Sequence, residues 1–322
     1  MSEPESNIMK NCYNVGVDVG GTNTHVALVD PQGRISQRSR FDSHMPLDQL
    51  VASIAEAVAK MQGSGYEIGG IGVGVPCANT RTGCVEGATE LPWPNPTPLA
   101  KMISDATGLP CRIANDANAA AAGEHAYGAA RGLDNFILLT LGTGVGAGVY
   151  CDGHLLNGRN GFAAELGHVV VDPEGPQCGC GRRGCLQMYC SAQGVKLIAS
   201  QLLAKSNAES SLRQLPLDEL TPLAIAQAAA KGDVLAIETY RRAGERLGSA
   251  CANFAAFTDP EAFVFFGGVA KAFPLFKETM LAAYRRDALF LYRDNVSFLP
   301  SSLPDADAAL LGAAAIAPTQ HQ

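Results

Sequence analysis

The chain has 322 residues, 47% of them apolar and 17% charged, which is enough apolar material for two domains and excludes a disordered or fibrous protein. Its net charge of −7 opposes binding to a nucleic-acid backbone, so we expect no nucleic-acid partner. No run reaches the roughly eighteen apolar residues of a membrane helix, and the polar, acidic first residues are unlike a secretory signal. We therefore expect a cytoplasmic protein with no membrane partner.

The first predicted elements, in chain order, are a hairpin and two helix–strand pairs. Alternating β-branched runs over residues 13–30 flank a glycine turn and predict the hairpin. Apolar residues at helical spacing predict a helix over residues 47–62, and a β-branched run over residues 68–75 predicts a buried strand. A helix over residues 98–107 leads to a strand over residues 111–114 and an alanine-rich helix. Helix followed by strand indicates parallel crossovers.

The second half of the chain begins with a similar hairpin over residues 136–156, about 120 residues after the first. The repetition indicates two similar lobes, although glycine-turned hairpins can also look alike by chance. Asp233 is the predicted N-cap of a long helix that runs toward residue 257, and residues 262–266 form a predicted strand. Residues 305–317 predict a last helix, and residues 203–221 a polar loop.

Glycine-rich turns follow three of the predicted strands. Backbone N–H groups without a Cβ can approach a phosphate closely, so three such turns favour a nucleotide site over simple chain reversals. The pattern matches neither the Walker motif nor the dinucleotide-binding glycine spacing. The candidate nucleotide-binding residues are Asp18, Gly20, Gly21, Thr22, Asn23, Gly142, Thr143, Gly144, Gly267 and Gly268. Of these, Asp18 is the candidate ligand for Mg²⁺.

A histidine and three cysteines form a candidate structural zinc site. His168 lies ten residues before Cys178, and Cys180 and Cys185 follow in the same glycine-rich loop. One imidazole and three thiolates complete a tetrahedral Zn²⁺ site. The other seven cysteines are scattered, and each is interpreted as a small buried hydrophobic residue.

Two acidic residues are candidates for binding a hydroxyl group. Glu165 lies three residues before His168, where its carboxylate can recognise a hydroxyl beside the metal-bound ring, or can simply be a surface charge. Asp116 follows Asn115 at the carboxyl end of a predicted strand, the usual place for a ligand crevice in α/β sheets. Asp116 is equally suited to be the N-cap of the following helix.

These motifs together resemble the ROK family of sugar kinases and repressors over nearly the whole chain. Residues 18–22 are similar to the family's phosphate motif, residues 113–118 to its catalytic segment, and residues 165–168 with the three cysteines to its zinc-linked substrate motif. The resemblance implies an α/β fold of two RNase H-like lobes of the actin-like, hexokinase-like ATPase type, with ATP in a cleft between them. The implied lobes are residues 1–117 with 303–322, and residues 118–302.

The resemblance also implies a reaction. Asp116 would be the base for a sugar hydroxyl, Asn115, Glu165 and His168 would grip sugar hydroxyls, and ATP with Mg²⁺ would supply the phosphoryl group. The implied function is ATP-dependent phosphorylation of a hexose at its 6-hydroxyl by a homodimeric enzyme. Glucose is the leading substrate, and N-acetylmannosamine or another hexosamine is the alternative.

Some positions depart from the family pattern and leave the sugar open. Gln187 stands where the family has a sugar-binding glutamate, and Thr89 stands in the loop on the sugar side. Cys77 and Ala164 replace common glycines. If Gln187 contacts the sugar, a carboxylate there would bind a hydroxyl more tightly, whereas the amide suits an N-acetyl carbonyl. A sugar-responsive repressor is the less favoured alternative, because it needs a helix-turn-helix and about a dozen residues precede the first predicted strand.

Overall fold

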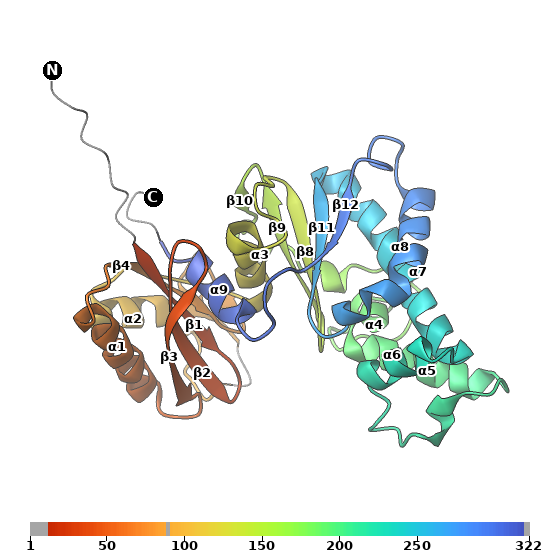
Figure 1. Ribbon diagram of the computed structural model, residues 1–322, viewed down its shortest axis with the longest axis horizontal. Helices are drawn as coiled ribbons and strands as arrows, with labels where there is room; N and C mark the ends of the chain where they lie inside the picture. The colour runs from red at the N-terminus through yellow and green to blue at the C-terminus, as the bar shows by residue number, and fades with distance from the viewer. Residues whose placement is uncertain (1–11, 88–90, 319–322) are drawn as a thin grey trace. The chain divides into compact units, whose positions relative to one another are not determined.

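The computed structural model describes residues 12–87 and 91–318. The chain divides into two compact units (Figure 1). Unit 1 comprises Met1–Tyr127 and Pro304–Gln322, and unit 2 comprises Gly128–Leu303. Helix α3 (Asp116–Tyr127), assigned mostly to the large lobe from sequence, belongs to unit 1. A methyl group at Gly312 would lie 2.5 Å from the carbonyl oxygen of Ala119, so α3 packs backbone to backbone on the C-terminal helix.

Unit 1 is built on a five-stranded sheet in the order β3-β2-β1-β4-β7. Strands β1 and β2 form the predicted hairpin, β3 extends it antiparallel, and β4 and β7 run parallel to β1. The strands are β1 (Tyr13–Val19), β2 (Asn23–Val29), β3 (Ile35–Asp42), β4 (Ile68–Gly74) and β7 (Cys111–Ala114), with a small β5 (Ala78–Asn79) and β6 (Cys84–Val85) pair. The helices are α1 (Leu47–Gly63), α2 (Leu99–Thr107), α3 and α9 (Ala308–Ala315).

Helix α9 packs closely against the unit 1 sheet at two glycines. A methyl group at Gly16 of β1 would lie 2.2 Å from the carbonyl oxygen of Leu310, and one at Gly72 of β4 would lie 1.8 Å from that of Ala313. Both glycines are therefore required for this close approach. The C-terminal segment thus belongs to the core of the unit that contains the first strand.

Unit 2 repeats the same arrangement with its sheet in the order β10-β9-β8-β11-β12. Its β8–β9 hairpin is antiparallel, and β11 and β12 run parallel to β8. The strands are β8 (Phe136–Leu141), β9 (Val145–Cys151), β10 (His154–Leu155), β11 (Ala262–Phe266) and β12 (Ser297–Pro300). The helices are α4 (Gln187–Cys190), α5 (Ala192–Lys205), α6 (Pro222–Ala230), α7 (Val234–Thr258) and α8 (Phe273–Asp287), with short 3₁₀ turns η1 (Leu166–His168), η2 (Ser211–Gln214) and η3 (Ala270–Ala272).

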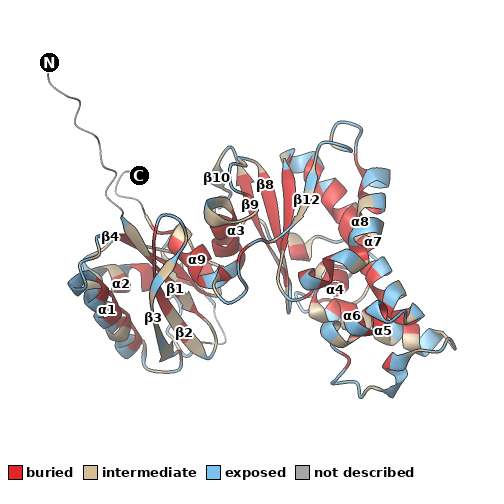
Figure 2. Cartoon of the chain, viewed as in Figure 1, coloured by how far each residue is buried: buried red, intermediate tan, exposed pale blue. Residues whose placement is uncertain are grey.

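The sequence predictions for these elements are confirmed where periodicity was strong. Buried residues line the sheets and the inner faces of the helices (Figure 2). The side chain of Asp233 caps α7 by accepting from the backbone N–H groups of Leu235 and Ala236. The predicted loop 203–221 was partly wrong, since it includes the end of α5 and the turn η2. Among the described residues, no helix has the length and apolarity to cross a bilayer.

Candidate active site and metal centre

The three parallel strands of unit 1 bring their carboxyl ends to one edge of the sheet. In the register of β1, β4 and β7, Asp18 lies beside Gly74, and Gly74 lies beside Ala114. The segments that follow these strands are the glycine turn after β1, residues 75–77, and the Asn115-Asp116 pair. The fold therefore gathers two of the predicted motifs at one edge of unit 1.

The glycine turn after β1 is tight and partly exposed. The N–H of Gly20 donates to the carbonyl oxygen of Asn23 at 3.1 Å, and Thr22 at the tip is exposed. The oxygen Oδ1 of Asn23 accepts from Nε of Arg40 at 3.0 Å, so that oxygen already has a partner. Burial raises the pKa of Asp18 above its usual value, because the ionised carboxylate loses solvation there.

Asn115, not Asp116, takes the N-cap role that the sequence left open. The oxygen Oδ1 of Asn115 accepts from the backbone N–H of Asn118 at 2.7 Å, so Asn115 is the residue that caps α3. This bond fixes the orientation of the Asn115 amide. Asp116 is the first residue of α3 and is exposed. The helix dipole at this position favours the ionised carboxylate.

Unit 2 places its two glycine turns side by side. The N–H of Gly142 donates to the carbonyl oxygen of Gly144 at 3.0 Å, which closes the turn between β8 and β9. Gly267 after β11 has φ of 104°, and a methyl group there would lie 2.7 Å from the carbonyl oxygen of Leu141. Because β8 and β11 are parallel, both turns lie at the same edge. Methyl groups at Gly142 and Gly268 would meet no atom within 4 Å, so their backbone is accessible.

The segment that carries Glu165 and His168 is held in an unusual backbone conformation. Ala164 has φ of 69°, in the left-handed region that favours glycine. A methyl group at Gly167 would lie 1.9 Å from the carbonyl oxygen of Val145, so the turn η1 is pressed against the start of β9. Glu165 is exposed and His168 is half-buried. The local fold thus fixes the position of His168 and leaves the carboxylate of Glu165 open to solvent.

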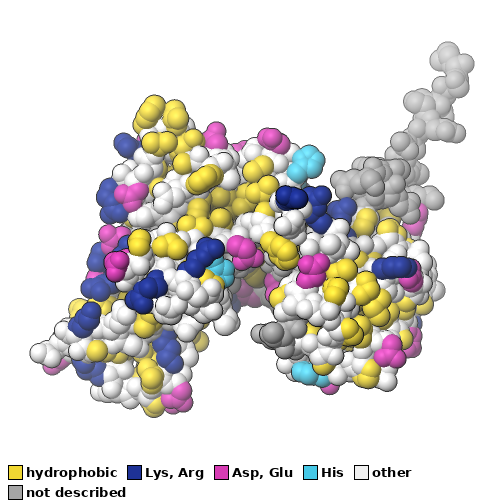
Figure 3. Space-filling view, turned by 180° about the vertical axis from the view of Figure 1, so that it is seen from behind, with side chains coloured by type: hydrophobic (Ala, Val, Ile, Leu, Met, Phe, Trp, Pro, Cys, Tyr) yellow, Lys and Arg dark blue, Asp and Glu magenta, His cyan; other side chains and the backbone are white. Residues whose placement is uncertain are grey.

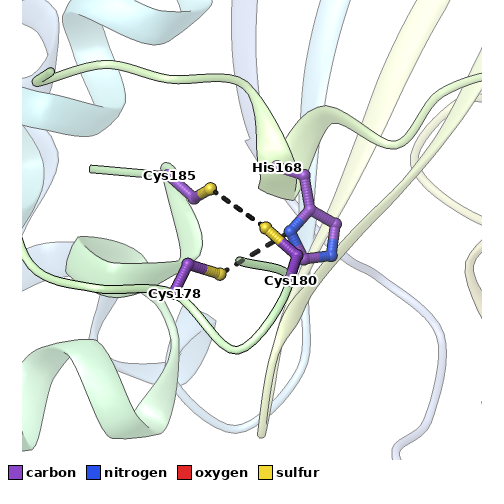
Figure 4. A group of neighbouring side chains, drawn as sticks. All are labelled: His168, Cys178, Cys180 and Cys185. Atoms are coloured by element: carbon purple, nitrogen blue, oxygen red, sulfur yellow. Dashed lines mark hydrogen bonds between the residues drawn. The ribbon is translucent and has the colours of Figure 1, made fainter. Parts of the chain in front are cut away.

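His168 and the three cysteines meet in one cluster (Figure 4), with all four ligand atoms within 4.8 Å of one another. Nδ1 of His168 lies 3.8 Å from Sγ of Cys178, and the sulfurs of Cys180 and Cys185 are 3.6 Å apart. Tetrahedral Zn²⁺ with its usual bond lengths places its ligand atoms about 3.5–3.8 Å apart. The cluster therefore fits a four-coordinate metal ion in ligand type, number and spacing.

Gln187 contacts this cluster. Its Nε2 donates to Sγ of Cys178 at 3.1 Å, and its Oε1 would lie 3.3 Å from a methyl group at Gly144. Burial raises the pKa of the Cys178 thiol, but hydrogen bonds from Cys180 and Gln187 outweigh it and lower that pKa to about 6. The amide predicted to bind sugar therefore stabilises a thiolate of the cluster. No pattern in the sequence predicts this contact.

The predicted site residues thus fall into separate groups. Unit 1 carries Asp18, the first glycine turn, Asn115 and Asp116, and unit 2 carries the other two glycine turns, Glu165, Gln187 and the cluster. Thr89 lies outside the described residues.

The sequence model that defines the ROK family matches residues 14–320 of this chain. The chain belongs to the ROK family. A glucokinase from Halalkalibacterium halodurans is 34% identical over 317 residues, covering 94% of each chain. An N-acetylmannosamine kinase from Citrobacter koseri is 32% identical over 316 residues, covering 94% of this chain and 98% of that one. A xylose repressor from Bacillus subtilis is 29% identical, covering 90% of this chain and 73% of the repressor.

Solved structures of the ROK family agree with the fold. The glucokinase from Streptomyces griseus in complex with glucose and AMPPNP is 33% identical, with a TM-score of 0.74, and covers 95% of this chain and 99% of that chain. A ROK hexokinase from Thermus thermophilus is 30% identical, with a TM-score of 0.79. The predicted fold class, two similar α/β lobes of the hexokinase-like ATPase type, is confirmed for this ROK protein.

Proposed function

We propose that this ROK protein phosphorylates the 6-hydroxyl of a hexose with ATP, and that glucose is its substrate. The observation that carries the proposal is the exposed carboxylate of Asp116 at the start of α3, on the same sheet edge as the glycine turn after β1. Glucokinases from several organisms at 34–36% identity support the choice of a sugar kinase.

The chemistry asked of Asp116 is acceptance of a proton. An ionised carboxylate at a helix N-terminus can hold the attacking hydroxyl of the sugar and take its proton as the new bond to phosphorus forms. The amide Nδ2 of Asn115, oriented by the cap bond to Asn118, would donate to a neighbouring hydroxyl. Positioning by such groups accounts for much of the catalysis of phosphoryl transfer.

The glycine turns would bind the triphosphate. Gly142 and Gly268 present accessible backbone at one edge of unit 2. Mg²⁺, when bound, would neutralise charge on the phosphates, and the partly buried Asp18 is the carboxylate proposed to hold it, directly or through water.

The metal cluster would hold the sugar-binding segment in place. His168 would ligate Zn²⁺ through one ring nitrogen, and the ring would then have a fixed orientation in which its other nitrogen faces a sugar hydroxyl. Glu165, exposed three residues earlier, would accept from a second hydroxyl. The role of this metal is structural, because the four protein ligands complete its coordination.

N-acetylmannosamine is the second candidate substrate, favoured by the N-acetylmannosamine kinase relative and by an amide at position 187. A panel of aldoses and N-acetylhexosamines, each assayed for ADP release with magnesium ATP, decides between the two. If metal-loaded protein phosphorylates none of the sugars in the panel, the proposal is refuted. A gel-shift assay tests the repressor alternative in parallel, and sedimentation tests the expected homodimer.

A further inference from the structure

A charged cavity of about 690 Å³ opens on unit 2, and none of the residues assigned to sugar, nucleotide or metal line it. Its walls come from residues 172–183, α5, α7 and the end of α8. Three carboxylates lie in the lining, those of Asp172, Glu174 and Glu245. Five guanidinium groups outnumber them, those of Arg183, Arg241, Arg242, Arg246 and Arg286. Basic and acidic side chains gather on the side of unit 2 that contains α7 and α8 (Figure 3).

Ion pairs hold the arginines of α7 in place. Nε of Arg242 donates to Glu238 at 2.7 Å, and Arg241 binds both Glu238 and Glu245. Hydrogen bonds from Arg241, with a further contribution from Arg242, lower the pKa of Glu238 to about 2, so these pairs stay ionised over the neutral range. These ion pairs orient the guanidinium groups of Arg241 and Arg242 in the wall.

Several donors in the cavity are left for a ligand. A guanidinium group has five N–H donors. Within the described part of the chain, Arg242 uses only Nε for its ion pair, and Arg246 uses only Nη2, which donates to Asp172 at 2.9 Å. The guanidinium of Arg183 makes no hydrogen bond or ion pair with any described residue. Three arginines thus present unused N–H groups to one cavity.

We propose that this cavity binds a small anion that carries a phosphate group. Planar guanidinium groups bind phosphate oxygens through paired, charge-assisted hydrogen bonds, which are stronger than neutral ones. The volume lies within the range of sites for small metabolites, and three of the arginines in the wall keep N–H donors that no carboxylate of the described chain occupies. Inorganic phosphate and a sugar phosphate share the recognised group.

The cavity shares a wall with the metal loop. Asp172 accepts from both Arg246 and the hydroxyl of Tyr189, and a methyl group at Gly184 would lie 1.5 Å from its carbonyl oxygen. The segment from Asp172 to Arg183 contains Cys178 and Cys180. An anion bound by Arg183 and Arg246 therefore restrains the loop that holds the metal ligands.

The test is direct binding to the full, metal-loaded chain without any turnover. Calorimetry with inorganic phosphate and, separately, with glucose 6-phosphate gives the two dissociation constants and distinguishes the two sources of the phosphate group. Hydrogen–deuterium exchange with the same two probes locates the site, and protection is expected in peptides covering residues 172–186 and 238–249. Combining Arg183→Gln with Arg242→Gln is expected to raise the dissociation constant at least about tenfold and to abolish this protection.

Arg285→Gln is the matched control, because Arg285 is an exposed arginine of α8 that does not line the cavity. Its binding and protection should equal those of the wild type. Protection confined to the glycine turns, or the absence of binding, would overturn the proposal. A third result would also overturn the proposal: the wild type binds no phosphate, and the double variant sediments with a different mass from the wild type. The arginines would then contact a second copy of the chain. None of these readouts depends on sugar phosphorylation.

Discussion

The two sheets have the same strand order, but their glycine turns stand in different electrostatic surroundings. Asp18 of unit 1 and Thr140 of unit 2 occupy equivalent positions in their hairpins. Each is the second-to-last residue of the first strand to be paired before the turn. Burial raises the pKa of Asp18, whereas the hydroxyl of Thr140 accepts from the backbone N–H of Gly146 at 3.1 Å. The equivalent turn therefore lies next to a carboxylate in unit 1, and next to a hydroxyl that already accepts a hydrogen bond in unit 2.

The segments after the parallel strands differ in the same way. In unit 1 the last of these strands leads to an exposed carboxylate at a helix N-terminus, Asp116. In unit 2 the strand β11 leads to Gly267 and Gly268, and the polar chemistry lies instead in the cysteine loop. Under the proposed function, the repeated scaffold would support proton transfer and cation binding in unit 1, and backbone recognition and metal-assisted rigidity in unit 2.

Asp116→Asn is expected to have the largest effect on activity, because it removes the proposed base of unit 1. The amide has the same volume but cannot take the hydroxyl proton, so the turnover number should fall about a thousandfold while the protein stays folded. The measurement is ADP release with saturating sugar, together with thermal unfolding. Asp48→Asn, which changes another exposed aspartate in the first turn of a unit 1 helix, should be nearly silent. Near-normal turnover by folded Asp116→Asn would remove Asp116 from the role of base.

Loss of the metal tests the contribution of unit 2. Cys180→Ser replaces a thiolate with a hydroxyl that binds Zn²⁺ poorly, so one zinc per chain should fall to none, and the melting temperature should fall with it. Elemental analysis and thermal unfolding measure both effects. Cys151→Ser changes a cysteine of β9 outside the cluster and should keep the zinc. Wild-type protein prepared without chelator that carries no stoichiometric zinc would contradict the assignment.

Because α9 packs closely on the unit 1 sheet, adding a single methyl group at their contact should lower the free energy of unfolding substantially. Gly72→Ala places that group 1.8 Å from the carbonyl oxygen of Ala313, so the free energy of unfolding should fall by about 3 kcal/mol. Denaturant titration gives the value. Gly63→Ala at the end of α1 meets no atom within 4 Å and should be neutral or slightly stabilising. Equal stabilities of the two variants would mean that α9 does not pack as described.

Gln187→Glu is expected to have the smallest effect. It tests whether the side chain at position 187 acts on the metal cluster or on the sugar. A carboxylate cannot donate to Sγ of Cys178 and repels its thiolate, so zinc affinity should fall about tenfold in competition with a chelator. Gln193→Glu, an exposed glutamine of α5, is the control. A lower KM for glucose with unchanged zinc affinity would show that position 187 contacts the sugar and acts independently of the metal.

Local signals in the sequence predicted many of the elements and the members of the histidine–cysteine cluster. Period-2 and helical patterns located the two hairpins, most of the helices of unit 1 and the cap at Asp233, because these depend on nearest neighbours along the chain. Three cysteines within eight residues predicted the cluster, since ligand type and short spacing nearly define such a site. The repeated hairpin also indicated two similar lobes, as the shared strand order confirms.

The partners of individual side chains and helices were decided only by the tertiary structure. The sequence could not show that Asn115 rather than Asp116 caps α3, because both residue types suit the position and only the bond to Asn118 distinguishes them. It could not show that Gln187 binds Cys178, or that α9 presses on Gly16 and Gly72 across almost the whole chain. The arginines of the charged cavity come from the cysteine loop, α7 and α8, and their shared environment exists only once those elements pack together. Periodicity encodes which face of an element is buried, but the partner of that face is fixed by the packing of the whole unit.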